Sequence, residues 1–295
     1  IVTEKNFNEY NSGVLFIHTK NIRKLLSQIS FGIFKKKPEN LIAVTGTNGK
    51  SSVSDFYYQI LRLSNKKVAS IGTLGVKSNS LNLNLSNTTI DPINLSKILN
   101  KLKKKKIENV ILEASSHGLH QNRLDGLFFN SAIFTNLSRD HLDYHKNFKN
   151  YLNAKLYLFE NLIKKKGFVI TDGKIPEFKK IKNISFKKKL KLFTFENNNF
   201  QLVSHSYKNN FQILKIKHNN LIHNIRVNLV GKIQIKNILM AVIAASKSNL
   251  DLKKILSVIP KLSPVEGRFE NIGKIKNKSL VFLDYAHTPD ALQTC

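Results

Sequence analysis

The amino-acid sequence predicts an α/β fold with a doubly wound, mostly parallel sheet and a small antiparallel β insertion. From about residue 41 to residue 170, short apolar runs alternate with segments of helical periodicity. This alternation is typical of consecutive strand–helix–strand units, which form parallel sheets. Between about residues 186 and 230, short alternating segments are separated by asparagine-rich turns, and this pattern indicates antiparallel strands.

The expected elements of the parallel core follow one another at short intervals. The strands are short, unbroken apolar runs, as in sheets that are covered on both faces. In the helices, apolar residues recur three and four positions apart, as Leu95, Leu99 and Leu102 do, so one helix face is predicted to be buried. The expected strands cover residues 41–44, 68–71, 110–112, 132–134 and 169–170, and the expected helices cover residues 52–63, 94–106 and 151–163.

The second half of the chain is expected to begin with the insertion. A domain boundary is expected between residues 264 and 273. The expected elements are strands at residues 193–195, 201–203, 211–216 and 225–227, a helix over 235–247, a strand over 279–284 and the start of a helix over 291–295.

Polar clusters directly follow three of the expected core strands. They occupy residues 46–51, 113–117 and 136–141. The carboxyl ends of parallel strands meet at one edge of a sheet, and ligands of open α/β sheets bind there. The three clusters are therefore expected to form one active site.

The first cluster reads Gly-Thr-Asn-Gly-Lys-Ser between a strand and a helix. Glycines let backbone amides approach phosphate oxygens, and a helix N-terminus adds positive potential. In such a loop Lys50 reaches the terminal phosphates and the Ser51 hydroxyl binds Mg²⁺. The general phosphate-loop pattern has a glycine where Val44 stands, and the alternative is an ordinary strand–helix turn. Strand, lysine, hydroxyl and helix together favour the phosphate loop.

Three further residue types suggest metal chemistry, each with a plain alternative. Glu113 stands alone at the end of an apolar strand and offers the hard oxygen that Mg²⁺ prefers, but helix capping or ion pairing explains such a carboxylate equally well. His117 and His141 are possible ligands, although an isolated histidine is more often a hydrogen-bonded structural residue. Lys155 lies near the apolar face of the 151–163 helix, where its side chain could also extend to solvent.

Lysine dominates the charge of the chain. Lys+Arg number 48 and Asp+Glu number 19, which gives a net charge of +29. An excess of this size favours contact with phosphates, but proteins that read nucleic acids use arginine forks and stacked aromatic rings. We therefore interpret the excess as a solvated, lysine-rich surface and expect no nucleic-acid partner.

Composition excludes several classes of protein. Apolar residues make up 41% of the 295 residues, which excludes a wholly disordered chain and fits about two domains. No window approaches the roughly 18 unbroken apolar residues of a membrane span. The single cysteine, Cys295, cannot form a disulfide within the chain, so we expect a cytoplasmic protein.

In their order along the chain, these motifs resemble those of the Mur ligase family. The matching segments are residues 45–51, 113–123, 136–145, 151–159, 267–270 and 284–292. The strings at residues 113–119 and 135–145 are most similar to the branch that adds the third peptide residue, the tripeptide synthetases. The resemblance runs from about residue 40 to the end of the chain.

This resemblance implies a reaction. ATP phosphorylates the free carboxylate of UDP-MurNAc-L-Ala-D-Glu, and the amine of a diamino acid attacks the acyl phosphate to give an amide, ADP and phosphate. The diamino acid is left open between meso-diaminopimelate and L-lysine, and we expect the former because it is commoner in the family. The alternatives are a folylpolyglutamate-synthetase-like ligase, against which the 115–123 string counts, and a catalytically silent fragment that binds nucleotides or nucleic acid.

The resemblance also assigns roles to residues. It implies catalytic roles for Lys50, His141 and Lys155, with Lys155 carbamylated, and Mg²⁺ ligation by Ser51, Glu113, His141 and Lys155. The implied ATP contacts are Gly46, Thr47, Asn48, Gly49, Lys50, Ser51, Asn237, Arg268, Asp284 and His287. The implied contacts to the UDP-MurNAc-peptide are Thr88, Thr89, Ser115, Gln121 and Arg123. The sequence departs from the family strings at Ile90, where proline is usual, and at Ile233 and Gln234, where phenylalanine and asparagine are usual.

Three regions follow from the same resemblance. Residues 1–39 correspond to the tail of an N-terminal UDP-binding domain, residues 40–264 to a central ATP-binding domain and residues 265–295 to the start of a C-terminal ligase domain. We therefore expect a fragment that catalyses no amino-acid-dependent ligation by itself. The motif that selects the amino acid is expected beyond Cys295.

Overall fold

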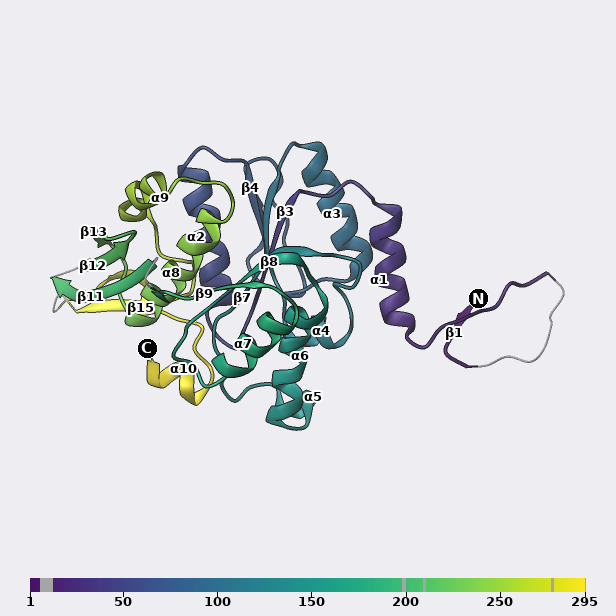
Figure 1. Cartoon of the computed structure of the whole chain (residues 1–295). Coiled ribbons are helices and arrows are strands. Elements are labelled where there is room, and N and C mark those ends of the chain that lie inside the picture. Colours follow the sequence, from purple (N-terminus) through teal and green to yellow (C-terminus); the bar gives the residue numbers. More distant parts are fainter. Residues whose placement is uncertain (6–12, 198–199, 209–210, 277–278, 295) are drawn as a thin grey trace.

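A computed structural model describes the chain except for residues 6–12, 198–199, 209–210, 277–278 and 295. The sole cysteine, Cys295, thus lies outside the described residues. The core is a seven-stranded sheet with the strand order β5-β4-β6-β3-β7-β8-β9 (Figure 1). Its strands are β3 (Asn40–Thr45), β4 (Val68–Gly72), β5 (Gly75–Ser78), β6 (Asn109–Glu113), β7 (Phe129–Phe134), β8 (Ile163–Thr171) and β9 (Lys191–Phe193).

The sheet is doubly wound around β3, and this confirms the predicted fold class. The chain first adds β4 and β6 on one side of β3 and then β7, β8 and β9 on the other side. All neighbours are parallel except β4 and β5, which form an antiparallel pair. Val44 pairs with Glu113, and Thr45 pairs with Phe134. The polar clusters that follow β3, β6 and β7 therefore meet at one edge of the sheet.

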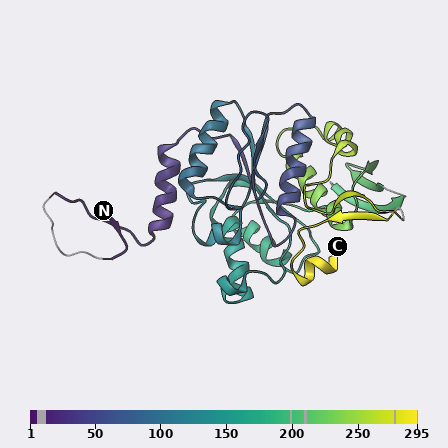
Figure 2. The same cartoon turned by 180° about the vertical axis from the view of Figure 1, so that it is seen from behind.

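Helices cover both faces of the sheet, as Figures 1 and 2 show. Alternate residues of β3 enter two separate cores, because successive side chains of a strand point to opposite faces. Ile42 and Val44 pack with α2 (Lys50–Leu63), α8 (Lys232–Ser246) and α9 (Leu252–Val258). Leu41 and Ala43 pack on the face that is covered by α1 (Ile22–Ile33), α3 (Pro92–Lys104), α4 (Ser116–His120), α6 (Phe148–Asn161) and α7 (Phe178–Lys187).

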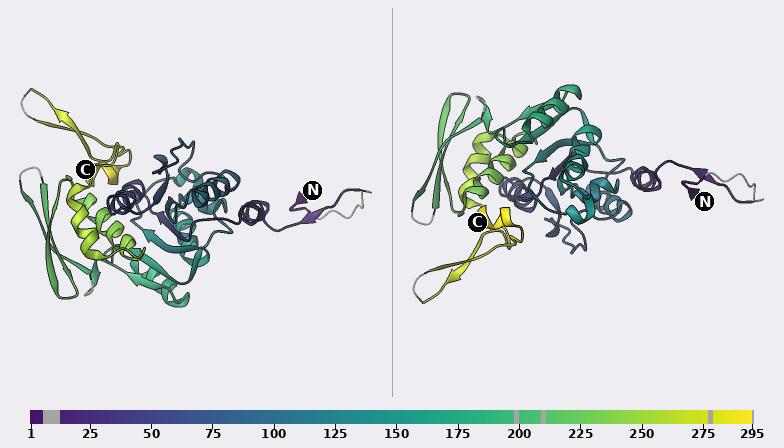
Figure 3. Two further views of the ribbon diagram at one scale, coloured as in Figure 1. Left: turned by 90° about the horizontal axis from the view of Figure 1, so that it is seen from above. Right: turned by 90° about the horizontal axis from the view of Figure 1, so that it is seen from below.

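The predicted antiparallel insertion is present as a four-stranded sheet. It consists of β10 (Glu196–Asn197), β11 (Phe200–Lys208), β12 (Phe211–His218) and β13 (Leu221–Val227). Leu214, Ile216 and Val227 on its inner side belong to the same core as α8. Figure 3 shows this sheet beside α8 and, as a separate arm, the hairpin of β14 (Glu270–Lys274) and β15 (Leu280–Leu283).

One predicted strand was assigned to the wrong sheet. Residues 193–195 were expected to open the insertion, but residues 191–193 form β9, which pairs in parallel with β8 at the edge of the main sheet. The registered pairs include Phe168 with Lys191 and Ile170 with Phe193. A strand of three residues shows too little alternation to indicate its partner.

The expected helices are present, but several begin earlier than predicted. Helix α2 begins at Lys50 rather than residue 52, and α3 and α6 begin after the capping residues Asp91 and Asn147. The prediction missed α1, α4, α7, α9, β5, β10 and β14, together with α5 (Leu142–His145), η1 (Ile259–Lys261), β1 (Val2–Thr3) and β2 (Ile17–His18). The last helix, α10 (Pro289–Thr294), was expected. Among the described residues, no helix has the length and apolar character needed to cross a membrane.

Two side chains fix the linker that leads from the core to the β14–β15 hairpin. Gln59 of α2 accepts a hydrogen bond from the backbone N–H of Ser263 (2.9 Å) and donates one to the carbonyl of the same residue (3.2 Å). Gln234 of α8 donates to the carbonyl of Arg268 (2.9 Å). These contacts hold the segment that carries Arg268 beside the carboxyl edge of the sheet.

Candidate functional site

The loop between β3 and α2 is anchored to the end of β7. The backbone N–H of Thr47 donates to the carbonyl of Asn136 (3.0 Å), and the N–H of Asn48 donates to the Asn136 side chain (2.9 Å). The Thr135 hydroxyl donates to the carbonyl of Asn48 (2.6 Å). Thr47 also shares a hydrogen bond with the Tyr151 hydroxyl (3.0 Å). A loop held at so many points keeps its shape before any ligand arrives, which lowers the entropic cost of binding.

Gly46 is required by close packing as well as by its backbone. Its φ is +146°, and a Cβ built there lies 1.8 Å from the Thr135 hydroxyl oxygen. We expect Gly46→Ala to lower the free energy of unfolding by about 2–3 kcal/mol or more, because both strain and overpacking oppose the methyl group. Chemical denaturation would measure the change. The control is Gly32→Ala in α1, where no atom lies within 4 Å of the new Cβ. Equal stability of the two variants would contradict the argument.

A cavity of about 450 Å³ opens at the carboxyl ends of β3, β6 and β7. It brings together residues from the phosphate loop, from α8 and from the segment that follows β15. Helix α2 begins in its wall, so the positive end of that helix dipole faces the cavity. The predicted site residues that line it are Thr47, Asn48, Gly49, Lys50, Ser51, Thr88, Glu113, His141, Asn237, Arg268, Asp284 and His287.

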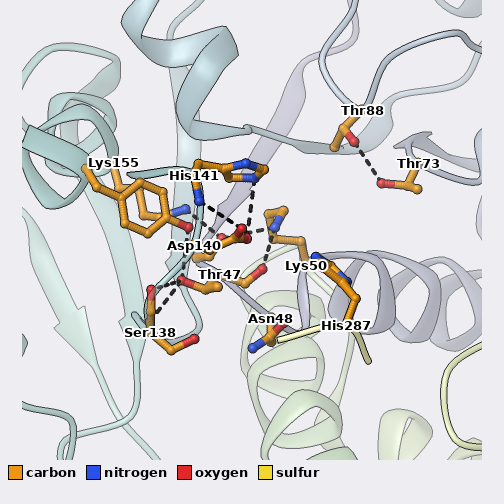
Figure 4. Close-up of polar contacts among 12 residues, drawn as sticks. Thr47, Asn48, Lys50, Thr73, Thr88, Ser138, Asp140, His141, Lys155 and His287 are labelled. Atoms are coloured by element: carbon orange, nitrogen blue, oxygen red, sulfur yellow. Dashed lines mark hydrogen bonds and ion pairs between the residues drawn. The ribbon is translucent and has the colours of Figure 1, made fainter. Parts of the chain in front are cut away.

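Two lysines from distant parts of the chain donate to the same carbonyl oxygen, that of Gly46. Lys155 lies 2.7 Å and Lys50 lies 3.0 Å from this oxygen, and Lys50 also donates to the carbonyl of Thr47 (2.7 Å). Figure 4 shows both lysines beside Asp140 and His141. The Lys155 ammonium is 4.4 Å from the centre of the Tyr151 ring. Only 1% of Lys155 is exposed, so the alternative of a side chain that extends to solvent is excluded.

The surroundings of Lys155 favour its neutral form. Burial, and then the charge of Lys50, lower the pKa of Lys155 well below its usual value, while Asp140 opposes the shift. Burial also lowers the pKa of Lys50, although Glu113 and Asp140 oppose this. A neutral lysine amine is a nucleophile, whereas the ammonium form is not.

Glu113 and Ser51 form a buried pair of oxygen ligands. Glu113 is 2% exposed and accepts a hydrogen bond from the Ser51 hydroxyl (3.0 Å). It also accepts from the N–H (2.9 Å) and the hydroxyl (3.2 Å) of Thr73. The next helix is capped by Ser115, not by Glu113. A carboxylate and a hydroxyl at the start of α2 are the donor types that Mg²⁺ accepts, so this pair fits the metal.

The pKa of Glu113 predicts how its removal changes stability with pH. Burial raises this pKa above the usual 4.5, although Lys50 and the hydrogen bonds from Thr73 and Ser51 oppose the shift. The folded protein therefore binds the proton more tightly than the unfolded chain, and stability is lost as the pH rises through the folded-state pKa. Without Mg²⁺, we expect Glu113→Gln to be more stable than the unmodified chain at neutral pH, by about 1 kcal/mol.

This gain should shrink as the pH falls toward 4.5, the usual carboxyl pKa, because the carboxyl is then protonated in both states. Thermal unfolding of both proteins over this pH range would measure the difference. A Glu113→Gln variant that is less stable at neutral pH would show that the carboxylate stabilises the fold.

Of the two histidines considered as metal ligands, one lines the cavity and the other lies outside it. His141 lines the cavity, and its Nε2 lies 3.4 Å from Asp140 Oδ2. His117 stands behind it, with a ring-centre separation of 4.7 Å. Burial is the main cause that lowers the pKa of both rings. Within the part of the chain that the structure describes, no group of three or more His, Cys, Asp or Glu side chains is arranged as a metal site.

Most residues expected to contact the peptide substrate form one hydrogen-bonded group behind Glu113. The Thr89 hydroxyl donates to the Glu113 carbonyl (2.8 Å) and accepts from the Ser115 N–H (2.9 Å). The Arg123 guanidinium donates to the Thr89 carbonyl and to the Gln121 side chain. Only Thr88 among the five expected residues lines the cavity. Its hydroxyl is 3.0 Å from that of Thr73.

The wall of the cavity opposite Glu113 is formed by α8 and by residues near the linker that leads to the β14–β15 hairpin. Asn237 approaches Gly49 so closely that a Cβ there would lie 2.6 Å from its side-chain oxygen. The Asp284 carboxylate accepts hydrogen bonds from the backbone of Phe269 (2.6 Å) and Ala286 (2.7 Å). The Arg268 guanidinium stands 4.7 Å from the centre of the Tyr285 ring. Asp284 therefore shapes the turn that presents Arg268 and Tyr285 to the cavity.

Several cavity residues were not predicted. Thr73 follows β4 and could have been found by the rule that polar residues at strand ends gather at one edge. Ser138 and Asp140 belong to a cluster that the sequence did indicate, but no role was assigned to them. Gln234 was noted only as a departure from a family string, and Tyr285 lies in the matching segment 284–292, but neither was given a role.

Comparisons with known proteins identify similar sequences and structures. The family model described as the Mur ligase middle domain matches residues 44–245. A UDP-N-acetylmuramoyl-L-alanyl-D-glutamate–2,6-diaminopimelate ligase of Rickettsia bellii is 38% identical over 298 residues, which cover 99% of this chain and 61% of the relative. This chain therefore spans about three fifths of that relative.

Two solved structures show the same fold. One, of a ligase with the same name, is 28% identical with a TM-score of 0.82, and the match covers 99% of this chain and 60% of that one. The other is Mycobacterium tuberculosis folylpolyglutamate synthase complexed with ADP, which is 14% identical with a TM-score of 0.74 over 92% of this chain and 67% of that one. At that identity the second match shows the fold alone.

Proposed function

The chain belongs to the Mur ligase family, and from this premise we propose that its gene product is an ATP-dependent amide ligase. Its substrates would be UDP-MurNAc-L-Ala-D-Glu and a diamino acid, meso-diaminopimelate, as the names of the relatives indicate. The observation that carries the proposal is that Lys50, Ser51 and Glu113 line one cavity, while Lys155 donates to the same Gly46 carbonyl as Lys50.

ATP would bind with its phosphates against the start of α2. The N-terminus of a helix and a glycine-containing loop favour an anion there. Lys50 would exchange its backbone acceptors, the carbonyls of Gly46 and Thr47, for phosphate oxygens. Asn237, Arg268 and His287 from the opposite wall would contact the rest of the nucleotide.

Ser51 and Glu113 would hold Mg²⁺ beside these phosphates, with His141 on the same cavity wall. The ion would neutralise charge on the transferred phosphoryl group.

Lys155 would react with carbon dioxide. Its neutral amine would attack the carbon, a C–N bond would form, and one proton would leave the nitrogen for solvent, so a carbamate would replace the cation. The raised share of neutral amine supports this step. The change would also replace repulsion between Lys155 and Lys50 by attraction, and it would supply a further hard oxygen ligand for Mg²⁺.

The ligation itself would depend on positioning and on charge neutralisation. The substrate carboxylate would attack the γ-phosphorus of ATP, and ADP would leave. The diamino-acid amine would then attack the acyl carbon, and phosphate would leave. Thr88, with Arg123 and Gln121 behind it, would hold the peptide end of the first substrate.

Phosphate release by the full-length gene product tests the proposal. The assay contains ATP, Mg²⁺ and UDP-MurNAc-L-Ala-D-Glu, with meso-diaminopimelate or L-lysine added separately. We expect release that depends on meso-diaminopimelate. Release with L-lysine alone would change the assigned amino acid. Activity with a folate and glutamate instead would favour the folylpolyglutamate-synthetase-like alternative, and nucleotide binding without any turnover would favour a silent binding protein.

A further inference from the structure

A dense group of lysines lies at the amino ends of the parallel strands, on the edge of the sheet opposite the cavity. Residues 35–37 precede β3, residues 104–106 precede β6, and residues 164–166 lie in the first part of β8. We call these nine lysines the basic face. Figure 1 shows the end of α3 and the chain entering β3 at the same end of the molecule, away from α10.

Contacts show that the three segments are neighbours. Lys103 bonds to Glu39, before β3 (3.2 Å), and to Glu108, before β6 (2.7 Å). Lys164 donates to the backbone carbonyl of Glu39 (3.4 Å). Glu39 and Glu108 are the only acidic residues between residues 35 and 39 and between residues 103 and 108, and both pair with Lys103. No ion pair among the described residues includes a lysine of the basic face.

Two lysines of the basic face stand where another residue would fit the backbone better. Lys106 has a φ of 59° and Lys166 a φ of 61°. This left-handed conformation costs most residues free energy, and glycine and asparagine tolerate it best. At other left-handed positions the chain uses asparagine, as at Asn65 and Asn249, but also lysine, at Lys146 and Lys189.

Exposed apolar side chains stand among these lysines. Ile33 ends α1, two residues before Lys35, and is 69% exposed. Phe128 directly precedes β7 and is 54% exposed. Lys37 reaches this loop and donates to the carbonyl of Gly126 (3.5 Å). The basic face thus combines a high positive charge with two protruding apolar groups.

We propose that the basic face docks on a lipid bilayer that contains anionic lipids. Basic residues near such a bilayer are attracted by its negative surface potential, and adjacent apolar side chains can enter the headgroup region. The three segments contain no arginine, whereas a nucleic-acid surface would be expected to use arginine forks. Lysine, a flexible point charge, suits a diffuse anionic surface.

This orientation leaves the cavity accessible from water. The six residues of β3 separate the basic face from the cavity by about 20 Å, at roughly 3.3 Å per residue. A protein docked through the basic face would therefore keep its substrates and products in the aqueous phase, while the enzyme stays next to the membrane.

Vesicle flotation of the 295-residue chain and of its full-length gene product tests the proposal. The vesicles are phosphatidylcholine alone or an equimolar mixture of phosphatidylcholine and phosphatidylglycerol. We expect both proteins to bind only the mixed vesicles and to dissociate as the salt concentration rises, because ions screen the attraction. Equal binding to both vesicle types, or binding to neither, would overturn the proposal.

A matched pair of triple variants locates the surface. Replacing Lys104 and Lys105 by glutamine and Lys106 by asparagine should weaken vesicle binding about a hundredfold, at roughly 1 kcal/mol per lysine. The control changes Lys174, Lys179 and Lys180 to glutamine, which removes the same charge from exposed positions elsewhere. Equal loss in both triple variants would mean that net charge alone drives binding, and the basic face would be rejected.

Single substitutions separate binding from folding and from other partners. Lys106→Asn and Lys166→Asn should raise Tm, since asparagine suits their backbone, while each weakens vesicle binding; a lower Tm with weaker binding would contradict the argument. Phe128→Ser should weaken binding without changing its salt dependence. The chain should also be tested for binding to a DNA duplex. Tight binding to DNA at salt concentrations at which the vesicles no longer bind would assign the surface to nucleic acid instead.

Discussion

Replacing Lys155 by alanine is expected to lower ligase turnover of the full-length gene product by a factor on the order of 10³, the loss typical of removing one preorganised group from a polar active site. Lys155 is buried, donates to the Gly46 carbonyl at 2.7 Å, and has a pKa well below its usual value. A carbamate on Lys155 would place a negative charge beside the Gly46 carbonyl, where the other side chain, Lys50, is a cation. Alanine removes the amine that would form it.

Lys155→Met is the matched control for packing. Methionine keeps most of the volume and the apolar stem but cannot react with carbon dioxide. We expect the same loss of turnover in both variants, and a loss in the unmodified enzyme when bicarbonate and dissolved carbon dioxide are removed. Undiminished turnover of Lys155→Ala, or no effect of bicarbonate, would remove this residue from the mechanism.

The stability of Lys155→Met gives an independent reading of the buried charge. A lysine whose pKa is lowered by folding destabilises the protein at low and neutral pH, and this cost disappears as the pH rises toward the unfolded-state value of 10.5. In buffer without bicarbonate, Lys155→Met should therefore be more stable than the unmodified chain at neutral pH, and the difference should narrow as the pH rises. A constant difference would mean that packing, not charge, causes it.

Replacing Lys50 by alanine is expected to weaken ATP binding about a hundredfold, as for the loss of one charged donor from a preorganised phosphate site. Lys50 is the first residue of α2 and lines the cavity, and its ammonium already lies among the loop carbonyls that face this space. A fluorescent ATP analogue titrated into the 295-residue chain would measure the change, since nucleotide binding is tested without ligation.

Lys232→Ala is the control for a lysine at a helix start. Lys232 is the first residue of α8, is exposed, and does not line the cavity. Its replacement should leave the affinity for ATP unchanged. An unaltered affinity in Lys50→Ala would contradict the assignment of the phosphate loop. Because the charge of Lys50 lowers the pKa of Lys155, Lys50→Ala should also favour the protonated form of Lys155.

Much of the fold could be predicted because it is encoded in short segments. Unbroken apolar runs located β3, β6 and β7, and the string at residues 46–51 located the loop between β3 and α2. The rule that carboxyl ends of parallel strands share one edge then predicted that three polar clusters meet. The structure confirms this convergence in one cavity.

The partners of short or polar segments could not be predicted in this way. Strand β9 joins the main sheet rather than the insertion, because hydrogen bonds to β8 decide its place and three residues give no periodic signal. Thr89 and Arg123 were expected to contact substrate. In the structure the Thr89 hydroxyl donates to the Glu113 carbonyl and Arg123 donates to the Thr89 carbonyl, contacts that depend on how three loops pack.

The sequence by itself determined the α/β class, the phosphate loop and the edge at which chemistry takes place, because backbone conformation and strand–helix alternation depend on neighbouring residues. The tertiary structure alone decided the state of Lys155 and the position of the basic face. Lys155 meets Gly46, 109 residues away in the chain, and only packing removes water from its amine and lowers its pKa. Likewise, three separate lysine runs become one surface only because parallel strands begin at the same edge of the sheet.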